Sequence, residues 1–205
     1  MKLITRDLRR RWPGDRWGSG RLRAAGAIAA VASLLACAAP ASLEFSNPDA
    51  MTVANQSEAR AAAIESEVAR VRAATSAFKS VDKAVAAGYR RDGGGCVDNQ
   101  PHGAMGYHHQ NDALLDGKIE VERPEMLVYE RLPDGEYRLN GVEYIVPFSA
   151  RPETSEPPTV MGQPLKPYPA LKIWYLHVWV WTENPSGLFA DWNPRVKCHG
   201  KTGGG

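Results

Sequence analysis

The stretch Leu171–Trp181, LKIWYLHVWVW, decides the fold of this chain. It is rich in β-branched and aromatic residues, which favour strands, and an Asn-Pro step follows it. Alternation along a strand divides it into two faces, and both are mainly apolar. We therefore expect a central strand covered on both sides, with His177 buried on one of them. Such a histidine needs a polar partner, because an unsatisfied polar group is costly inside a protein.

Further strand signals precede this stretch. Residues 126–131 (MLVYER) and 136–139 (EYRL) flank Leu132-Pro133-Asp134-Gly135, a turn in which proline presets φ and glycine accepts a positive φ. Asn140-Gly141 is either a bulge or a second tight turn before the strand at 142–146 (VEYIV). The proline-rich residues 148–170 predict an extended surface loop, and residues 184–198 predict mostly turns.

A helix is expected from Ser57 to Ala87, followed by Gly88 as its C-terminal cap. Its length indicates that it packs across a sheet or is broken once. Its apolar stripe follows spacings of 3, 4 or 7 residues and consists of Ile64, Val68, Val71, Phe78, Val81 and Val85. One or two helices before three to five antiparallel strands predict an α+β fold, with a long N-terminal helix packed on a small antiparallel sheet. We expect residues 56–200 to form this single domain.

Three of the five histidines fall within residues 96–116, a segment whose glycines predict a loop. Glu143, like His177, is a polar residue among apolar neighbours on its strand. If the two strands are adjacent, these side chains can meet, with His108 from the loop as a third ligand and His102 or His109 as a fourth. Two histidines and a carboxylate are typical of open iron, zinc or manganese sites. We therefore predict a transition-metal ion, copper, zinc or iron, at this site.

Residues 1–36 have the order of a secretory signal: a basic region, a short apolar run and a small residue at the cut. The apolar run is too short to cross a bilayer of roughly 30 Å as a helix. Cys37 follows Leu-Leu-Ala, which resembles the lipobox of bacterial lipoproteins, so we predict lipidation of Cys37 and a membrane anchor. Residues 37–55 would then be the lipid-anchored linker, and residues 201–205 a disordered tail. An ordinary signal peptide cut elsewhere is the alternative.

The apparent basicity of the chain belongs to this signal. Residues 1–36 hold 8 of the 25 basic and 2 of the 23 acidic residues, which leaves 17 basic and 21 acidic residues and a net charge of −4. Nucleic-acid binding therefore has no electrostatic support. Cys96 and Cys198 remain as an even pair, and we expect a disulfide between them in an oxidising compartment. A pair of thiolate metal ligands is the weaker alternative.

Several segments together resemble a family of uncharacterised exported bacterial proteins: CV-x5-GAMGYHH, PEMLVYE, NGVEYIVPF, LHVWVW and NPSGLFADWNPRVKC. The resemblance covers about residues 65–198 and implies secretion and a single domain, but no activity. The positions that match the family are Cys96, His108, Glu143, His177 and Cys198. An aromatic residue is usual in the family where this chain has His109, so His109 ranks below His108 as a ligand.

These observations predict an exported, lipid-anchored envelope protein of the periplasm or outer membrane that binds a transition metal through His108, Glu143 and His177, with help from His102. The first alternative is a non-catalytic envelope protein in which the same side chains form a buried hydrogen-bond network. The second is a metal-dependent oxygenase or hydrolase built on the same residues. The membrane is the only partner that the sequence predicts.

Overall fold

The computed structural model describes residues 48–199, and three helical elements come first in this range: α1 (Pro48–Thr75), the 3-10 helix η1 (Ser76–Lys79) and α2 (Val81–Ala86). The helical region thus begins earlier than the expected Ser57 and is broken once. The side chain of Ser80 accepts a hydrogen bond from the backbone N–H of Lys83, so it caps α2 where the first helix has ended. Gly88, with φ +98°, terminates α2 as predicted.

The strands form one antiparallel sheet in the order β1-β3-β4-β5-β9-β8, with β2 paired to β3. These strands are β1 (Arg90–Arg91), β2 (Val97–Asn99), β3 (Gly103–Gln110), β4 (Met126–Arg131), β5 (Tyr137–Pro147), β8 (Lys166–Tyr168) and β9 (Ile173–Val178). A separate two-stranded ribbon consists of β6 (Thr159–Val160) and β7 (Gln163–Pro164), and a 3-10 helix, η2 (Asp112–Leu114), precedes β4. The predicted α+β class is confirmed.

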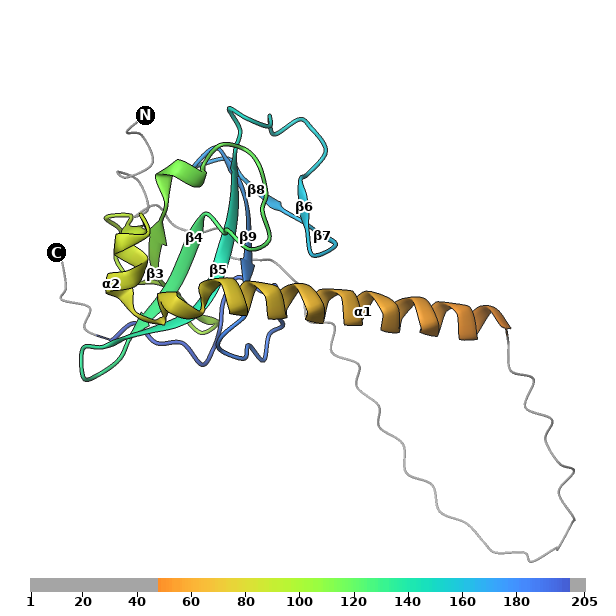
Figure 1. Ribbon diagram of the computed structural model, residues 1–205, viewed down its shortest axis with the longest axis horizontal. Helices are drawn as coiled ribbons and strands as arrows, with labels where there is room; N and C mark the ends of the chain where they lie inside the picture. The colour runs from red at the N-terminus through yellow and green to blue at the C-terminus, as the bar shows by residue number, and fades with distance from the viewer. Residues whose placement is uncertain (1–47, 200–205) are drawn as a thin grey trace, which may run out of the picture.

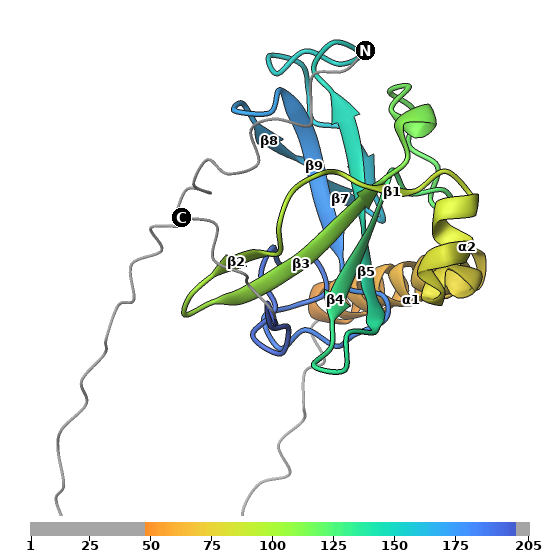
Figure 2. The ribbon, with the colours of Figure 1, turned by 90° about the vertical axis from the view of Figure 1, so that its left-hand side faces the viewer.

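The helices cover one face of the sheet, as Figures 1 and 2 show. The main hydrophobic core lies on this face and joins Val68 and Val71 of α1 to Leu127, Tyr144 and Leu176 of the sheet. Figure 1 also shows the N-terminal half of α1 extending beyond the sheet, where residues 52–63 are all exposed. None of the helices in residues 48–199 combines the length and hydrophobicity that a bilayer span requires.

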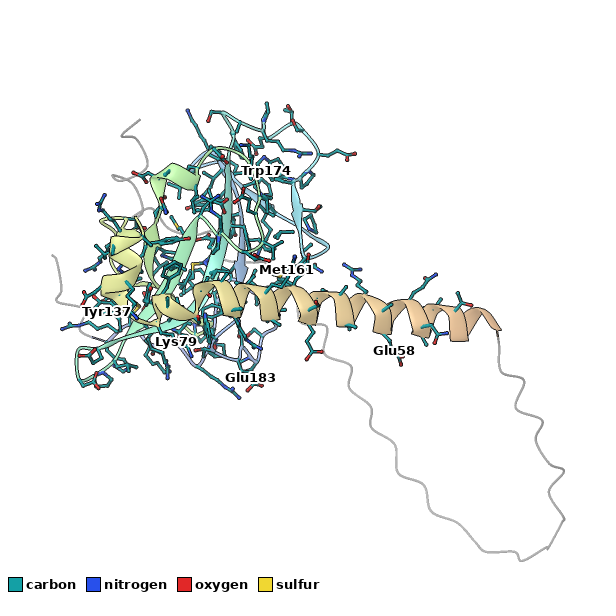
Figure 3. The ribbon with its side chains drawn as sticks, viewed as in Figure 1. Glu58, Lys79, Tyr137, Met161, Trp174 and Glu183 are labelled. Atoms are coloured by element: carbon teal, nitrogen blue, oxygen red, sulfur yellow. A yellow bond between two sulfur atoms is a disulfide. The ribbon has the colours of Figure 1, made fainter. Side chains whose placement is uncertain are left out.

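The described part of α1 also contacts the segment after β6. The guanidinium of Arg60 donates a hydrogen bond of 2.9 Å to the carbonyl oxygen of Gly162, next to the buried Met161 that Figure 3 labels. Glu58, labelled in the same figure, lies on the projecting part of the helix and is exposed. Arg60 therefore holds α1 to the domain at a point within its otherwise exposed residues 52–63.

Strand β9 is central, between β5 and β8, as its sequence predicted. It is shorter than the expected Leu171–Trp181 and begins only after Lys172, whose φ of +56° is outside the strand region. Trp174, Leu176 and Val178 belong to the core under the helices, while Ile173 and Tyr175 pack on the opposite face. The two apolar faces read from the sequence are thus both buried.

The predicted hairpin joins β4 to β5, and Leu132 N–H donates to Glu136 O at its turn. Asn140 proves to be a bulge: Val128 pairs with Gly141 and Tyr129 with Leu139, so Asn140 has no partner in this ladder. Its carbonyl instead accepts the backbone N–H groups of Trp181 and Thr182. This bulge sets the side-chain direction along the rest of β5, including that of Glu143.

Two segments expected to be loops contain strands. Residues 96–116 include β2 and β3, and every residue of β3 is buried. Gly106 has φ +115°, and a Cβ at this position would lie 2.2 Å from the carbonyl oxygen of Tyr129. The glycine allows the backbone of β4 to approach closely, whereas the sequence suggested that it belongs to a loop. Residues 148–170 likewise contain β6, β7 and β8. Val160 and Leu165 in this stretch are buried despite the surrounding prolines.

The expected disulfide joins Cys96 to Cys198, whose Cα atoms are 5.6 Å apart. It ties the C-terminal segment (residues 184–198) to the start of β2, and this segment consists mostly of turns as predicted. Asn193 exchanges backbone hydrogen bonds with Ala104, and Lys197 N–H donates to Glu130 Oε1 at 2.8 Å. The C-terminal segment is thereby fixed against the sheet at several points. Cys37, the predicted signal and linker up to residue 47, and the tail from residue 200 lie outside the described residues.

Candidate metal centre

Strand pairing brings Glu143 and His177 together. Glu143 on β5 is the direct register partner of His177 on the neighbouring strand β9, so their side chains leave the sheet side by side on one face. His108 lies on β3, paired with Val128 of β4, and Val128 pairs with Gly141 of β5. His108 therefore shares this face and approaches Glu143 from the other side of β4. The face is the one that the helices leave free.

The three side chains converge at their tips. His108 Nε2 lies 3.4 Å from His177 Nε2, His108 Nε2 lies 3.6 Å from Glu143 Oε2, and His177 Nε2 lies 3.7 Å from the same oxygen. Each residue offers one ligand atom, and these atoms all lie within 4.8 Å of one another. The group could hold a metal ion. The convergence that the sequence predicted for these three residues is present.

The group is sealed from solvent, and burial disfavours the charged form of all three members. Only 1% of the His177 side chain and 5% of each of the other two are exposed. Burial lowers the pKa of His108 and of His177, so both imidazoles are held neutral, with lone pairs available for an ion. Burial also raises the pKa of Glu143, and the carboxylates of Asp191 and Asp92 raise it further. Without a cation, burial thus favours the neutral acid form of Glu143.

A second polar cluster lies behind His177. Its Nδ1 is buried and has no hydrogen-bond partner, and Asp191 Oδ1 lies 3.9 Å away. Asp191 forms an ion pair with Lys166 on β8, and the hydroxyl of Tyr175 donates to its other oxygen at 3.4 Å. The rings of Trp179 and His177 are stacked, with centroids 6.4 Å apart. The C-terminal segment, which carries Asp191, therefore closes the space beside the histidine.

His102 and His109 do not join the group. His102 is exposed in the turn between β2 and β3, and its backbone N–H donates to the carbonyl oxygen of Asn99. His109 points to the helix-covered face, where its ring packs edge-on against Tyr129 at 4.7 Å between centroids. Burial, with Arg91 and His108 adding to it, lowers the pKa of His109 to about 4. The fourth ligand expected from His102 or His109 is therefore not supplied by either.

Sequence reasoning missed Asp191 and Lys166. Asp191 stands between two Asn-Pro steps in residues 184–194. This pattern indicates turns and gives no sign that one of the side chains faces a buried site. Lys166 lies in the proline-rich stretch that predicted only a surface loop. One signal could have found Asp191: it is the only acidic residue within the C-terminal segment, which Cys198 ties to the histidine-bearing part of the chain.

Scans of the chain against protein-family models, curated proteins and solved structures each found no match. The chemistry of the site therefore rests on the residues and geometry described above.

Proposed function

We propose that this protein binds a divalent transition-metal ion, with zinc as the best fit, through His108 Nε2, His177 Nε2 and a carboxylate oxygen of Glu143. The observation that carries the proposal is the meeting of these three lone-pair-bearing atoms in a sealed site. Their separations of 3.4, 3.6 and 3.7 Å exceed the usual hydrogen-bond range of about 2.7–3.2 Å. Close hydrogen bonding among the three does not account for their arrangement.

The separations support tetrahedral geometry. Ligand atoms about 2.0–2.2 Å from a tetrahedral ion lie about 3.3–3.6 Å from one another, whereas neighbouring ligands of an octahedral ion lie about 2.8–3.1 Å apart. The observed 3.4–3.7 Å matches the tetrahedral case with little movement. Imidazole nitrogen and carboxylate oxygen also suit zinc. Iron and copper share parts of this ligand chemistry, and they are tested as competitors below.

Charge balance supports a divalent cation. Asp92 and Asp191 raise the pKa of Glu143, and Lys166 lowers it, so the surroundings of the carboxyl group are negative on balance. An ionised Glu143 would add one more negative charge to this buried region. A divalent ion would offset that charge and replace the proton that Glu143 otherwise retains. Three protein ligands leave a fourth position of a tetrahedral ion for water or another small ligand.

We also propose that the protein acts outside the cytoplasm, anchored by a lipid on Cys37. The Cys96–Cys198 disulfide supports an oxidising location. The order of residues 1–37 supports export and acylation. In a bacterial host, mass spectrometry of the N-terminal peptide should find a diacylglyceryl group on Cys37. Cys37→Ser should move the protein from the membrane fraction to the soluble envelope fraction, and an unchanged membrane fraction would contradict the anchor.

Elemental analysis of the full chain, purified from an exporting host with its disulfide formed, tests the metal proposal. We expect close to one zinc per chain after exposure to zinc, iron and copper together. His177→Ala should lose it, and His102→Ala is the matched control because His102 is exposed and outside the group. Equal metal in wild type and His177→Ala would end the proposal. A melting temperature of the purified wild type that a chelator leaves unchanged would favour the hydrogen-bond network instead.

A further inference from the structure

Asp191 lies beside the ring nitrogen of His177 that does not face Glu143, and it is not one of the three proposed ligands. His177 is 1% exposed, and its Nε2 faces Glu143 and His108. Its other ring nitrogen, Nδ1, is buried without a hydrogen-bond partner. A neutral imidazole that offers the Nε2 lone pair to an ion carries its proton on Nδ1, and a buried N–H needs an acceptor. Asp191 Oδ1, at 3.9 Å, faces this nitrogen.

Two neighbouring strands hold Asp191 in this place. Lys166 of β8 and Tyr175 of β9 are register partners, and both contact the Asp191 carboxylate, the lysine through an ion pair and the tyrosine through its hydroxyl. Tyr175 lies two residues before His177 on the same face of β9. The carboxylate is thus fixed relative to the strand that carries the histidine. Only 14% of the Asp191 side chain is exposed, so water screens it little.

We propose that Asp191 is a positioning residue of the metal centre. It accepts the Nδ1–H of His177 when the ion is bound, which fixes the imidazole tautomer and directs the Nε2 lone pair towards the ion. Carboxylates commonly serve metal-bound histidines in this way, and their loss typically weakens metal binding by about 10–100-fold. This inference rests on the proposed metal binding, and it adds a residue from the C-terminal segment to a site otherwise built by the sheet.

A purely structural role for Asp191 makes a different prediction. Asp191 pairs with Lys166, so it could serve only to pin the C-terminal segment to β8. In that case the loss of either partner would have the same effect. If Asp191 acts through His177, the loss of Lys166 leaves the acceptor present, with the Tyr175 hydroxyl still in contact with its carboxylate. It also removes a positive charge near Glu143 and His177, which does not weaken cation binding.

The test compares zinc affinity, measured by competition with a chromophoric chelator, in full-length wild type, Asp191→Ala, Asp191→Asn and Lys166→Met. The absorption spectrum of cobalt-loaded protein reports the ligand geometry of the same variants. We expect Asp191→Ala to bind zinc about 10–100-fold more weakly with an altered cobalt spectrum. Asp191→Asn should recover much of the affinity, because its amide oxygen can accept the same hydrogen bond. Lys166→Met should lose clearly less affinity than Asp191→Ala, because the Tyr175 hydroxyl still contacts the Asp191 carboxylate.

Each other outcome overturns the inference. Equal weakening in Lys166→Met and Asp191→Ala would assign Asp191 a structural role. Wild-type affinity in Asp191→Ala, or no recovery in Asp191→Asn, would remove Asp191 from the metal centre. Circular dichroism and the intact disulfide verify folding of each variant, and Asp191→Asn, with nearly the same shape, keeps the test open if the alanine variant is unstable. Wild type that binds neither zinc nor cobalt would instead end the proposed function itself.

Discussion

His108 and His109 are adjacent in sequence, equally buried and opposite in surroundings. His108 faces the side of the sheet that the C-terminal segment covers, where another imidazole and a carboxylate approach it within 3.6 Å. His109 faces the helix-covered side, where tyrosine rings surround it. Burial lowers the pKa of both. The difference teaches that a buried neutral histidine becomes a candidate ligand only where other lone pairs converge on it.

The two histidines can be separated by substitution. His108→Ala should weaken zinc binding by more than about 100-fold, because even the outer partners of metal ligands cost about 10–100-fold when lost. His109→Phe should retain zinc affinity, since it replaces one ring by another among tyrosines. Calorimetric titration with zinc measures both. Similar loss in the two variants would contradict the assignment of the faces.

The C-terminal segment, which covers the His108 side of the sheet, can be loosened without substituting any of the three proposed ligands. Cys96→Ser combined with Cys198→Ser should lower the free energy of unfolding by about 2–5 kcal/mol, because the link closes a long loop in the unfolded chain. Urea unfolding of zinc-free protein measures this loss. We expect zinc to remain bound in the folded fraction, since neither sulfur belongs to the group. Loss of zinc from a variant that is fully folded would show that binding needs the C-terminal segment to be fixed by the disulfide.

Glu125 offers a buried carboxylate for comparison with Glu143. Glu125 Oε2 accepts the backbone N–H of Ile145 at 3.0 Å, and burial raises its pKa to about 8. Between its ordinary pKa of 4.5 and about pH 8, the folded state keeps a proton that the unfolded state releases, so rising pH favours unfolding. Wild type should therefore lose roughly 1–3 kcal/mol relative to Glu125→Gln from pH 5 to pH 8.

Urea unfolding of zinc-free protein at several pH values measures this difference. A difference that stays constant with pH would mean that Glu125 titrates normally in the folded state. Glu125→Gln should also keep its zinc, because Glu125 lies outside the three-residue group.

Glu143→Gln should lose zinc and leave the metal-free protein at least as stable at pH 7, because an amide replaces a carboxyl group whose charged form burial disfavours.

The parts of the fold that local patterns determine were predictable. The alternation in residues 171–181 predicted a central, doubly buried strand, and Leu132–Gly135 predicted the hairpin. Helix propensity, length and Gly88 predicted the helical region, its end and the possibility of one break, but not the position of the break near Ser80, which depends on a cap within an otherwise helical pattern. Strand β3 was missed because Gly103 and Gly106 suggested a loop, whereas both permit close approach of other backbone.

The candidate site was predictable as far as polar residues on apolar strands reveal it. Glu143 and His177 stood out for that reason, and their direct pairing follows from the neighbouring positions of β5 and β9. The structure places His108, and not His109, beside Glu143 and His177. The sequence ranked the two by family resemblance, because their opposite faces become apparent only once β3 is a strand. Asp191 could not be predicted, since its position depends on the long-range packing of a turn-rich segment against β8 and β9.

The most direct test of the metal centre is anomalous X-ray diffraction from crystals of the zinc-loaded full chain, with data on both sides of the zinc absorption edge. We predict one strong peak about 2.0–2.2 Å from His108 Nε2, His177 Nε2 and a Glu143 oxygen. A peak located elsewhere, or none while the two imidazoles and the carboxyl group keep their present separations, would contradict the account.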